Sequence, residues 1–229
     1  MPDDGQRHTI SEVVQVDTDP DVIAAREASN AIDQFDTVLK LIDDAVQGGR
    51  PFRLKPSTIL SLHRIALNGL NPMAGTFRNA SVGIQGSRHT PPREHLVPSL
   101  IEEMCEWIEA KWTTLSALDL CAYVMWRLNW IHPFSDGNGR TSRAVAYLVL
   151  CARAGFNLPG RKTIPEQIAE NQTPYYDALE KLDEMIDHEN PDLSPMIVLL
   201  EACLREQLNS ALQAVTAAVD AQSEARKFH

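Results

Sequence analysis

The apolar positions of this chain recur mostly at spacings of three and four residues, the pattern of amphipathic helices. The first such segment starts at Asp19-Pro20, a capping residue followed by proline, and ends at Gly48-Gly49. The polar pair Ser29-Asn30 offers a point at which this segment can split into two helices. The same spacing predicts further helices over residues 56–69, 96–112, 116–131, 138–154, 165–170 and 173–188, and a long one from Ser194.

Residues 116–131 are apolar on nearly every side, with Leu120, Tyr123 and Trp126 among them. A helix of this kind must be surrounded by protein, so we expect it to lie at the centre of the domain. The segment 138–154 is similarly apolar and is closed by Gly155, a residue suited to a left-handed helix cap.

One stretch departs from helical spacing. Between residues 75 and 92 glycines are frequent, and Ser81 to Gln85 alternates weakly, as a short strand or hairpin does. Residues 1–18 are polar without periodicity and are interpreted as a mobile tail. We therefore predict an all-α fold with one short β-hairpin, built as a single domain over residues 19–229 that includes the long C-terminal amphipathic helix.

The charge, the length of the apolar runs and the cysteine spacing disfavour several classes of protein. The 229 residues carry 21 Lys and Arg against 31 Asp and Glu, a net charge of −10, which disfavours binding to nucleic acid. The longest apolar runs are about half the roughly 20 residues that cross a bilayer, and the N-terminus lacks the pattern of a secretory signal. The four cysteines form no CxxC pair. We expect a cytoplasmic protein without membrane spans, disulfides or a zinc site.

The segment from His132 to Arg143 carries the candidate chemistry. It joins the central helix to the next one, so free backbone N–H groups and the positive end of a helix dipole face the loop. Gly137 and Gly139 let the backbone approach a phosphate without a side chain in the way, and Asn138 tolerates a tight conformation. These features predict an anion-binding site.

Four side chains of this loop extend the prediction to phosphate chemistry. Arg140 and Arg143 share a helix face and can bind two phosphate groups. Asp136 supplies the hard oxygen that Mg²⁺ prefers. The imidazole of His132, with an ordinary pKa of about 6.5, can take a proton from an attacking hydroxyl. Singly, each residue fits a cap, a turn or a solvated face, but their order within twelve residues favours a reactive site.

His132 to Arg143 matches the motif HxFx(D/E)GNGRxxR of the Fic family at every specified position, and the chain resembles that family over about residues 30–190. The resemblance implies a helical fold and an enzyme that transfers AMP from ATP to a Tyr, Thr or Ser hydroxyl of a target protein, releasing pyrophosphate. Other stretches with family-like sequence are Leu62-His63-Arg64, Ala74 to Arg78, Gly86 to Pro92 and Tyr175-Tyr176.

The resemblance also implies a role for each matched residue. The base is His132, the Mg²⁺ ligand is Asp136, the phosphate cradle is Gly137, Asn138 and Gly139, and the phosphate contacts are Arg140 and Arg143. Tyr175 and Tyr176 resemble residues on the nucleoside side of the site, although core packing is the expected role of at least one of them.

A stretch before the third helix resembles the flap with which the family aligns its target. An exposed strand edge can add an extended peptide through main-chain hydrogen bonds and so present a side-chain hydroxyl. A plain surface hairpin explains the stretch equally well. The residues concerned are Val82, Gly83, Ile84, Gln85 and Gly86.

Residues 29–34 partly match the family's inhibitory motif (S/T)xxxE(G/N). Ser29 fits, but Asp33 stands where the motif has Glu. Asp is one methylene shorter, so we expect its pairing with Arg143, and hence any inhibition, to be weak or absent. The preference for Ser and Asp near a helix N-terminus explains these residues nearly as well.

Several alternatives stay open. A phosphotransferase of the Doc type is disfavoured, because that relative has Lys at the position of Gly139, but transfer of another nucleotide or of phosphocholine is compatible with the loop. A nucleotide-binding regulatory module without catalysis is a different class, and the intact His132 argues against it. The apolar stripe of the last helix can pack on the domain or form a homodimer. The sequence does not identify the target protein.

Overall fold

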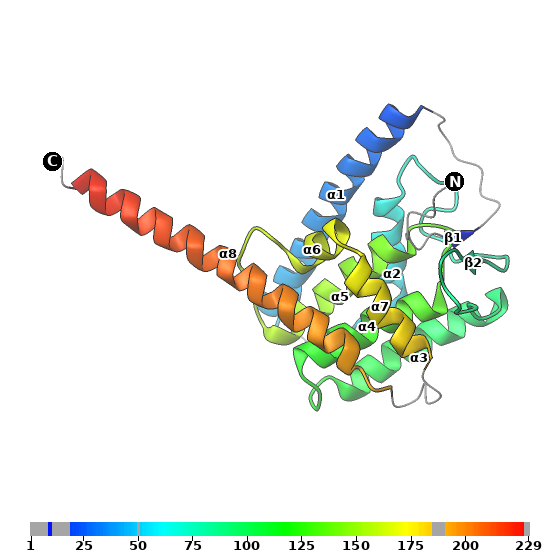
Figure 1. Cartoon of the computed structure of the whole chain (residues 1–229). Coiled ribbons are helices and arrows are strands. Elements are labelled where there is room, and N and C mark those ends of the chain that lie inside the picture. Colours follow the sequence, from blue (N-terminus) through cyan, green and yellow to red (C-terminus); the bar gives the residue numbers. More distant parts are fainter. Residues whose placement is uncertain (1–8, 11–18, 50, 185–190, 227–229) are drawn as a thin grey trace.

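Helices form almost all of the described secondary structure. The computed structural model describes residues 9–10, 19–49, 51–184 and 191–226, with side chains up to residue 219. Two short strands, β1 (Thr9–Ile10) and β2 (Gly83–Ile84), and a 3₁₀ turn at Glu94–Leu96 accompany the helices (Figure 1). The α-helices are α1 (Pro20–Gln47), α2 (Pro56–Ala66), α3 (Val97–Lys111), α4 (Ala117–Ile131), α5 (Asn138–Ala154), α6 (Ile164–Glu170), α7 (Thr173–Asp183) and α8 (Ser194–Arg226).

The helix ends lie close to the predicted positions because local capping residues set them. The side chain of Asp19 accepts a hydrogen bond from the backbone N–H of Asp21 at 3.0 Å, and Pro20 occupies the first turn of α1. Ser116 and Asp119 form a reciprocal capping box at the start of α4. Gly155 ends α5 with a φ of +84°. The last residues of the predicted helix over 173–188 lie outside the described part.

The predicted split of the first helix does not occur. Asn30 is buried in the middle of a continuous α1, and its side-chain amide donates to the backbone carbonyls of Ala66 and Asn68, at 3.3 and 2.9 Å. Its polar group thus satisfies carbonyls at the end of α2, so a polar residue at this position ties two helices together instead of ending one.

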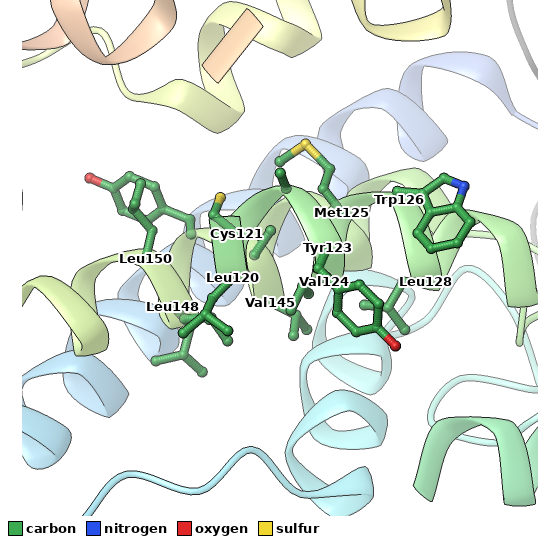
Figure 2. Packing of buried hydrophobic residues seen from close by; sticks show 14 of the residues in the cluster. Leu120, Cys121, Tyr123, Val124, Met125, Trp126, Leu128, Val145, Leu148 and Leu150 are labelled. Carbon is green, nitrogen blue, oxygen red and sulfur yellow. The ribbon is translucent and has the colours of Figure 1, made fainter. Parts of the chain in front are cut away.

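The core is built around α4 and α5, which pack against each other along their lengths, as Figure 2 shows. The prediction of a central helix is confirmed: Trp126 and Met125 of α4 are completely buried. The Trp126 indole donates to a carboxylate oxygen of Asp183 on α7 at 3.1 Å. Helices α1 and α2 pack on α5, while α3, α7 and α8 pack on α4. The loop between α4 and α5 is therefore supported from several sides.

The β structure differs in one respect from the predicted hairpin. A strand forms at Gly83–Ile84, within the stretch that alternates, but its antiparallel partner is Thr9–Ile10, so that Thr9 lies opposite Ile84 and Ile10 opposite Gly83. Residues 9 and 10 are thus ordered against the domain, although they belong to the segment predicted as a mobile tail. A two-residue strand is too short to show an alternating pattern in sequence.

Helix α8 packs on the domain only in its first part. Met196 and Leu200 are buried, and the buried amide of Gln207 donates to the Tyr147 hydroxyl at 2.9 Å. Beyond this point Leu212 is 66% exposed, and the helix extends away from the other elements (Figure 1). Among the described residues, no helix has a stretch long and apolar enough to cross a bilayer.

Two substitutions on α8 test where its packing ends. Leu200→Ala removes a fully buried side chain and should lower the free energy of unfolding by about 2–5 kcal/mol. Leu212→Ala, at an exposed position, should change it by less than about 0.5 kcal/mol. Urea denaturation of the three proteins measures both values. An equally large loss for Leu212→Ala that depends on protein concentration would show that a second copy covers this face.

Candidate active site

The backbone of His132 ends α4 in a left-handed conformation. Its φ is +50° and its ψ is +59°, and within the described residues it is the one non-glycine residue with positive φ. Buried Arg78 holds this conformation: its Nε donates to the carbonyl of His132 at 2.8 Å, and its terminal nitrogens donate to the carbonyls of Ala80 and Pro92. A strained residue that is fixed by several hydrogen bonds is typical of a functional position.

The hydrogen bonds of the His132 ring define its tautomer. Nδ1 lies 3.2 Å from the carbonyl oxygen of Asn129, which can only accept, so Nδ1 carries the hydrogen. The neutral imidazole then has its free lone pair on Nε2. Nε2 lies 2.8 Å from the hydroxyl oxygen of Thr9, which therefore donates to it. The ring is placed to accept a proton from a hydroxyl.

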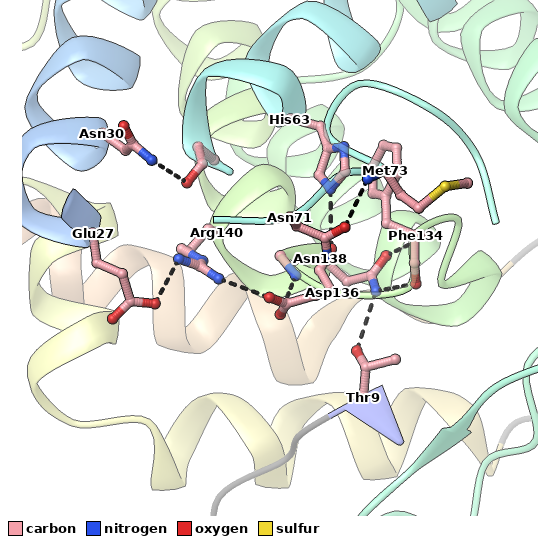
Figure 3. A network of polar contacts seen from close by, with 12 residues as sticks. Thr9, Glu27, Asn30, His63, Asn71, Met73, Phe134, Asp136, Asn138 and Arg140 are labelled. Carbon is pink, nitrogen blue, oxygen red and sulfur yellow. Dashed lines mark hydrogen bonds and ion pairs between the residues drawn. The ribbon is translucent and has the colours of Figure 1, made fainter. Parts of the chain in front are cut away.

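Phe134 and Asn138 anchor the loop that follows. The Asn138 amide oxygen accepts from the Phe134 backbone N–H at 2.9 Å, and its NH₂ group donates to the Phe134 carbonyl at 2.8 Å (Figure 3). The buried ring of Phe134 stacks on His63, with ring centroids 3.6 Å apart. Asn138 thus has a structural function in addition to its predicted place in the phosphate cradle.

His63 supports the loop from α2, a role that the sequence did not reveal. Its Nδ1 accepts from the N–H of Gly75 at 2.9 Å, and its Nε2 donates to the backbone carbonyl of Asp136 at 3.0 Å. The contact with Gly75 needs a neutral ring, because a protonated Nδ1 cannot accept, and burial lowers the pKa of His63 to about 4.

Backbone geometry requires a glycine at position 137, and Gly139 lies close to an arginine side chain. Gly137 precedes α5 with a φ of +72°, and a Cβ there would lie 3.1 Å from the Leu67 side chain. A Cβ on Gly139 would lie 3.3 Å from Nη1 of Arg143. The loop therefore leaves the N-terminus of α5 open on the side where the arginines lie, as binding of a phosphate requires.

The two arginines of the motif have different surroundings. Arg140 binds two carboxylates: Nη1 lies 2.9 Å from Oε1 of Glu27, and Nη2 lies 3.3 Å from Oδ2 of Asp136 (Figure 3). No carboxylate of the described residues lies within ion-pair distance of Arg143. Burial lowers the pKa of Arg143 from its ordinary value, yet a guanidinium stays charged. Arg143 is thus a desolvated cation available to an anion.

The carboxylate that α1 brings to the motif is Glu27, not Asp33. Asp33 and Ser29 are exposed, and six residues of a helix turn a side chain by about 240° relative to Glu27. Ser29 and Asp33, which partly match the inhibitory motif, are therefore not brought to the arginines. Glu27 had no motif to indicate it, because its contact with Arg140 depends on how α1 packs against α5.

A cavity of about 590 Å³ joins these groups. The buried Tyr175 hydroxyl accepts from the Asn129 side chain at 2.6 Å, so this tyrosine has a structural role, as expected for one of the pair. Tyr176 is half-buried, and its hydroxyl donates to Gln172. Of the flap residues, Ile84 reaches the cavity. The lining includes Thr9, Ile84, His132, Asp136 to Arg140, Arg143, Gln172, Tyr175 and Tyr176.

Fold and site define the chain as a helical protein in which a glycine-containing loop at a helix N-terminus lies next to a histidine that lines the same cavity. Residues 53–150 match the Fic/DOC family. Protein adenylyltransferase Fic of Aedes aegypti is 30% identical over 191 residues, which cover 82% of this chain and 35% of that protein. The same-named protein of Drosophila persimilis is 30% identical over 189 residues, covering 82% and 34%. The chain belongs to the Fic family and spans about a third of the length of these relatives.

Solved structures show the same fold. A Fic-domain signalling protein of Bacteroides thetaiotaomicron superposes with a TM-score of 0.65 at 24% identity, covering 82% of this chain and 73% of that one. A fragment of Fic-1 from C. elegans superposes with a TM-score of 0.65 at 21% identity, covering 82% of this chain and 52% of that one. BepC of Bartonella tribocorum, solved with bound AMPPNP, superposes with a TM-score of 0.53 at 15% identity, covering 81% of this chain and 87% of that one. The predicted helical Fic-type fold is confirmed.

The neutral His63 makes stability depend on pH. Its pKa is about 4 in the folded protein and 6.5 in the unfolded chain, so the unfolded chain takes up the proton first as pH falls. The stability that the neutral ring contributes to the folded protein is fully present above pH 6.5 and is lost as the pH falls from 6.5 to 4. The free energy of unfolding decreases by about 3 kcal/mol over this interval.

Urea denaturation of the nucleotide-free protein at several pH values measures this loss. His63→Gln lacks the titrating ring, so its free energy of unfolding should fall by about 3 kcal/mol less over the same pH interval. Parallel curves for the two proteins would contradict a neutral, buried His63.

Proposed function

We propose that this chain is an adenylyltransferase that transfers AMP from ATP to a hydroxyl side chain of a protein. The observation that carries the proposal is the contact between Nε2 of His132 and a hydroxyl, at 2.8 Å, in the same cavity as the loop glycines and both arginines. The names of the curated relatives support AMP as the transferred group, and the neighbour with bound AMPPNP supports an adenine nucleotide.

The chemistry follows from the positions of the groups. The acceptor oxygen attacks the α-phosphorus of ATP, the bond from this phosphorus to the pyrophosphate oxygen breaks, and pyrophosphate leaves. His132 Nε2 takes the proton of the hydroxyl. Arg143, Arg140 and the N-terminus of α5 bind the phosphate oxygens on which negative charge develops. Catalysis here depends on positioning and electrostatic stabilisation rather than on a covalent enzyme intermediate.

Asp136 is the residue that would hold Mg²⁺. Its side chain is 54% exposed, lines the cavity and contacts only the Arg140 guanidinium and the Gly137 N–H in the described part of the chain. The described residues contain no cluster of three or more metal-ligating side chains. One carboxylate fits Mg²⁺, which usually keeps waters and substrate phosphates as its other ligands. A bound Mg²⁺ would neutralise phosphate charge.

The alternatives differ in the group that is transferred. Incubation with ATP labelled in the α- or the γ-phosphate separates adenylyl transfer from phosphoryl transfer, and a binding module would transfer neither label. A different nucleotide would compete with ATP for the cavity. The cytoplasmic location remains a prediction; the four free, buried cysteines are compatible with a reducing compartment.

His132→Ala tests the proposed base. The variant loses the proton acceptor, so transfer of α-labelled AMP to protein should fall by at least about 100-fold. ATP binding, measured by calorimetry, should persist, because the arginines and glycines are intact. Circular dichroism and a thermal melt report whether the variant is folded. Undiminished transfer by a folded variant would contradict the assignment.

Glu27→Ala tests whether α1 restrains the site. Glu27 occupies donors of Arg140 that a nucleotide phosphate would otherwise use, and the pair is partly exposed. Its removal should strengthen ATP binding about two- to fivefold, as expected for an exposed ion pair. Asp33→Ala, on the exposed face of the same helix, is the matched control and should leave affinity unchanged. A larger gain for Asp33→Ala than for Glu27→Ala would contradict this role of Glu27 and identify Asp33 as the inhibitory residue.

A further inference from the structure

The flap edge is occupied by the chain's own N-terminal segment. Thr9 and Ile10 pair antiparallel with Ile84 and Gly83, which is the way an extended peptide adds to an exposed strand. Residues 82–86 were predicted as the flap that aligns a target, and the segment lying there belongs to the same molecule. The flap thus has an intramolecular ligand.

The pairing presents one hydroxyl to the base. Side chains alternate along a strand, so Thr9 faces the cavity while Ile10 is 59% exposed. The Thr9 oxygen lies 2.8 Å from His132 Nε2 and 3.3 Å from the Asn138 amide nitrogen (Figure 3 shows the contact with Asn138). The amide of Asn138 is oriented by the Phe134 backbone, so it donates to Thr9, and the Thr9 proton is directed to the histidine.

Thr9 leaves the phosphate side of the cavity accessible. The cavity that Thr9 lines is also lined by Gly137, by Arg143 of α5 and by Tyr176 of α7. Here a hydroxyl donates to the one ring nitrogen that can accept its proton, next to groups suited to phosphate.

We propose that Thr9 is an acceptor of AMP within its own chain, an inference that rests on the proposed function. Thr9 Oγ1 attacks the α-phosphorus of ATP, and a phosphodiester bond between Thr9 and AMP forms. The bond between the α-phosphorus and pyrophosphate breaks, and pyrophosphate leaves. The proton of the hydroxyl passes to His132 Nε2. The product is a chain that carries one adenylyl group at residue 9.

The test uses the full chain with Mg²⁺ and α-labelled ATP, followed by fragmentation mass spectrometry to locate the modified residue. Wild type should carry AMP on Thr9. Thr9→Val keeps the shape but lacks the hydroxyl, so self-labelling should fall at least about tenfold, because a positioned intramolecular acceptor outcompetes hydroxyls that must diffuse in. Thr9→Ser should restore labelling. Ser11→Ala is the matched control and should label like wild type.

The concentration dependence tests whether transfer occurs within one chain. The fraction labelled per unit time should not change over a tenfold dilution of the protein. A rate that falls in proportion to concentration, or AMP on another residue with Thr9→Val labelling like wild type, would overturn the inference.

A protein lysate separates this inference from the proposed function. Wild type that labels lysate proteins but not Thr9 would overturn the inference and leave the adenylyltransferase intact. Thr9→Val that still labels lysate proteins, with no label on itself, would support the inference. No label on any protein would overturn the proposed function.

Discussion

The structure depends on how α4 ends. His132 adopts a left-handed backbone conformation that is costly for a residue with a side chain, and Arg78 stabilises it by donating to the His132 carbonyl at 2.8 Å. This turn directs the imidazole away from the core and into the cavity, while the carbonyl of Asn129 fixes its tautomer. The loop that follows then places the N-terminus of α5, the proposed phosphate site, beside the proposed base. The histidine, the glycines and the arginines can act together because this one turn is held in place.

Much of the fold could be predicted because its signals are local. Asp19-Pro20 and Gly155 mark helix ends by their own backbone and side-chain preferences, and the apolar sequence of α4 indicates a helix enclosed by others. Gly137 is a further local signal, since its backbone has a positive φ of +72°. The signals that predicted the helical fold therefore come from residues that are close together in sequence.

The contacts that the sequence did not reveal are all long-range. Arg78, His63 and Glu27 reach the loop from segments 50 or more residues away, and their roles depend on how helices pack. Asp33, the partial match to the inhibitory motif, lies on an exposed face of α1, and this placement likewise depends on how the helix packs. Thr9 lies in a polar segment without periodicity, and two strand residues carry too little pattern to be recognised. Only the folded chain brings its hydroxyl to His132.

The protonation of the His132 ring tests the central claim most directly. Long-range ¹H–¹⁵N correlation spectra of ¹⁵N-histidine-labelled protein, recorded above the ordinary imidazole pKa and assigned with His132→Ala, distinguish the two neutral tautomers. We predict a hydrogen on Nδ1 and a free lone pair on Nε2, since Nδ1 faces the Asn129 carbonyl and Nε2 faces the Thr9 hydroxyl. A hydrogen on Nε2 would contradict a site built to accept the proton of a hydroxyl.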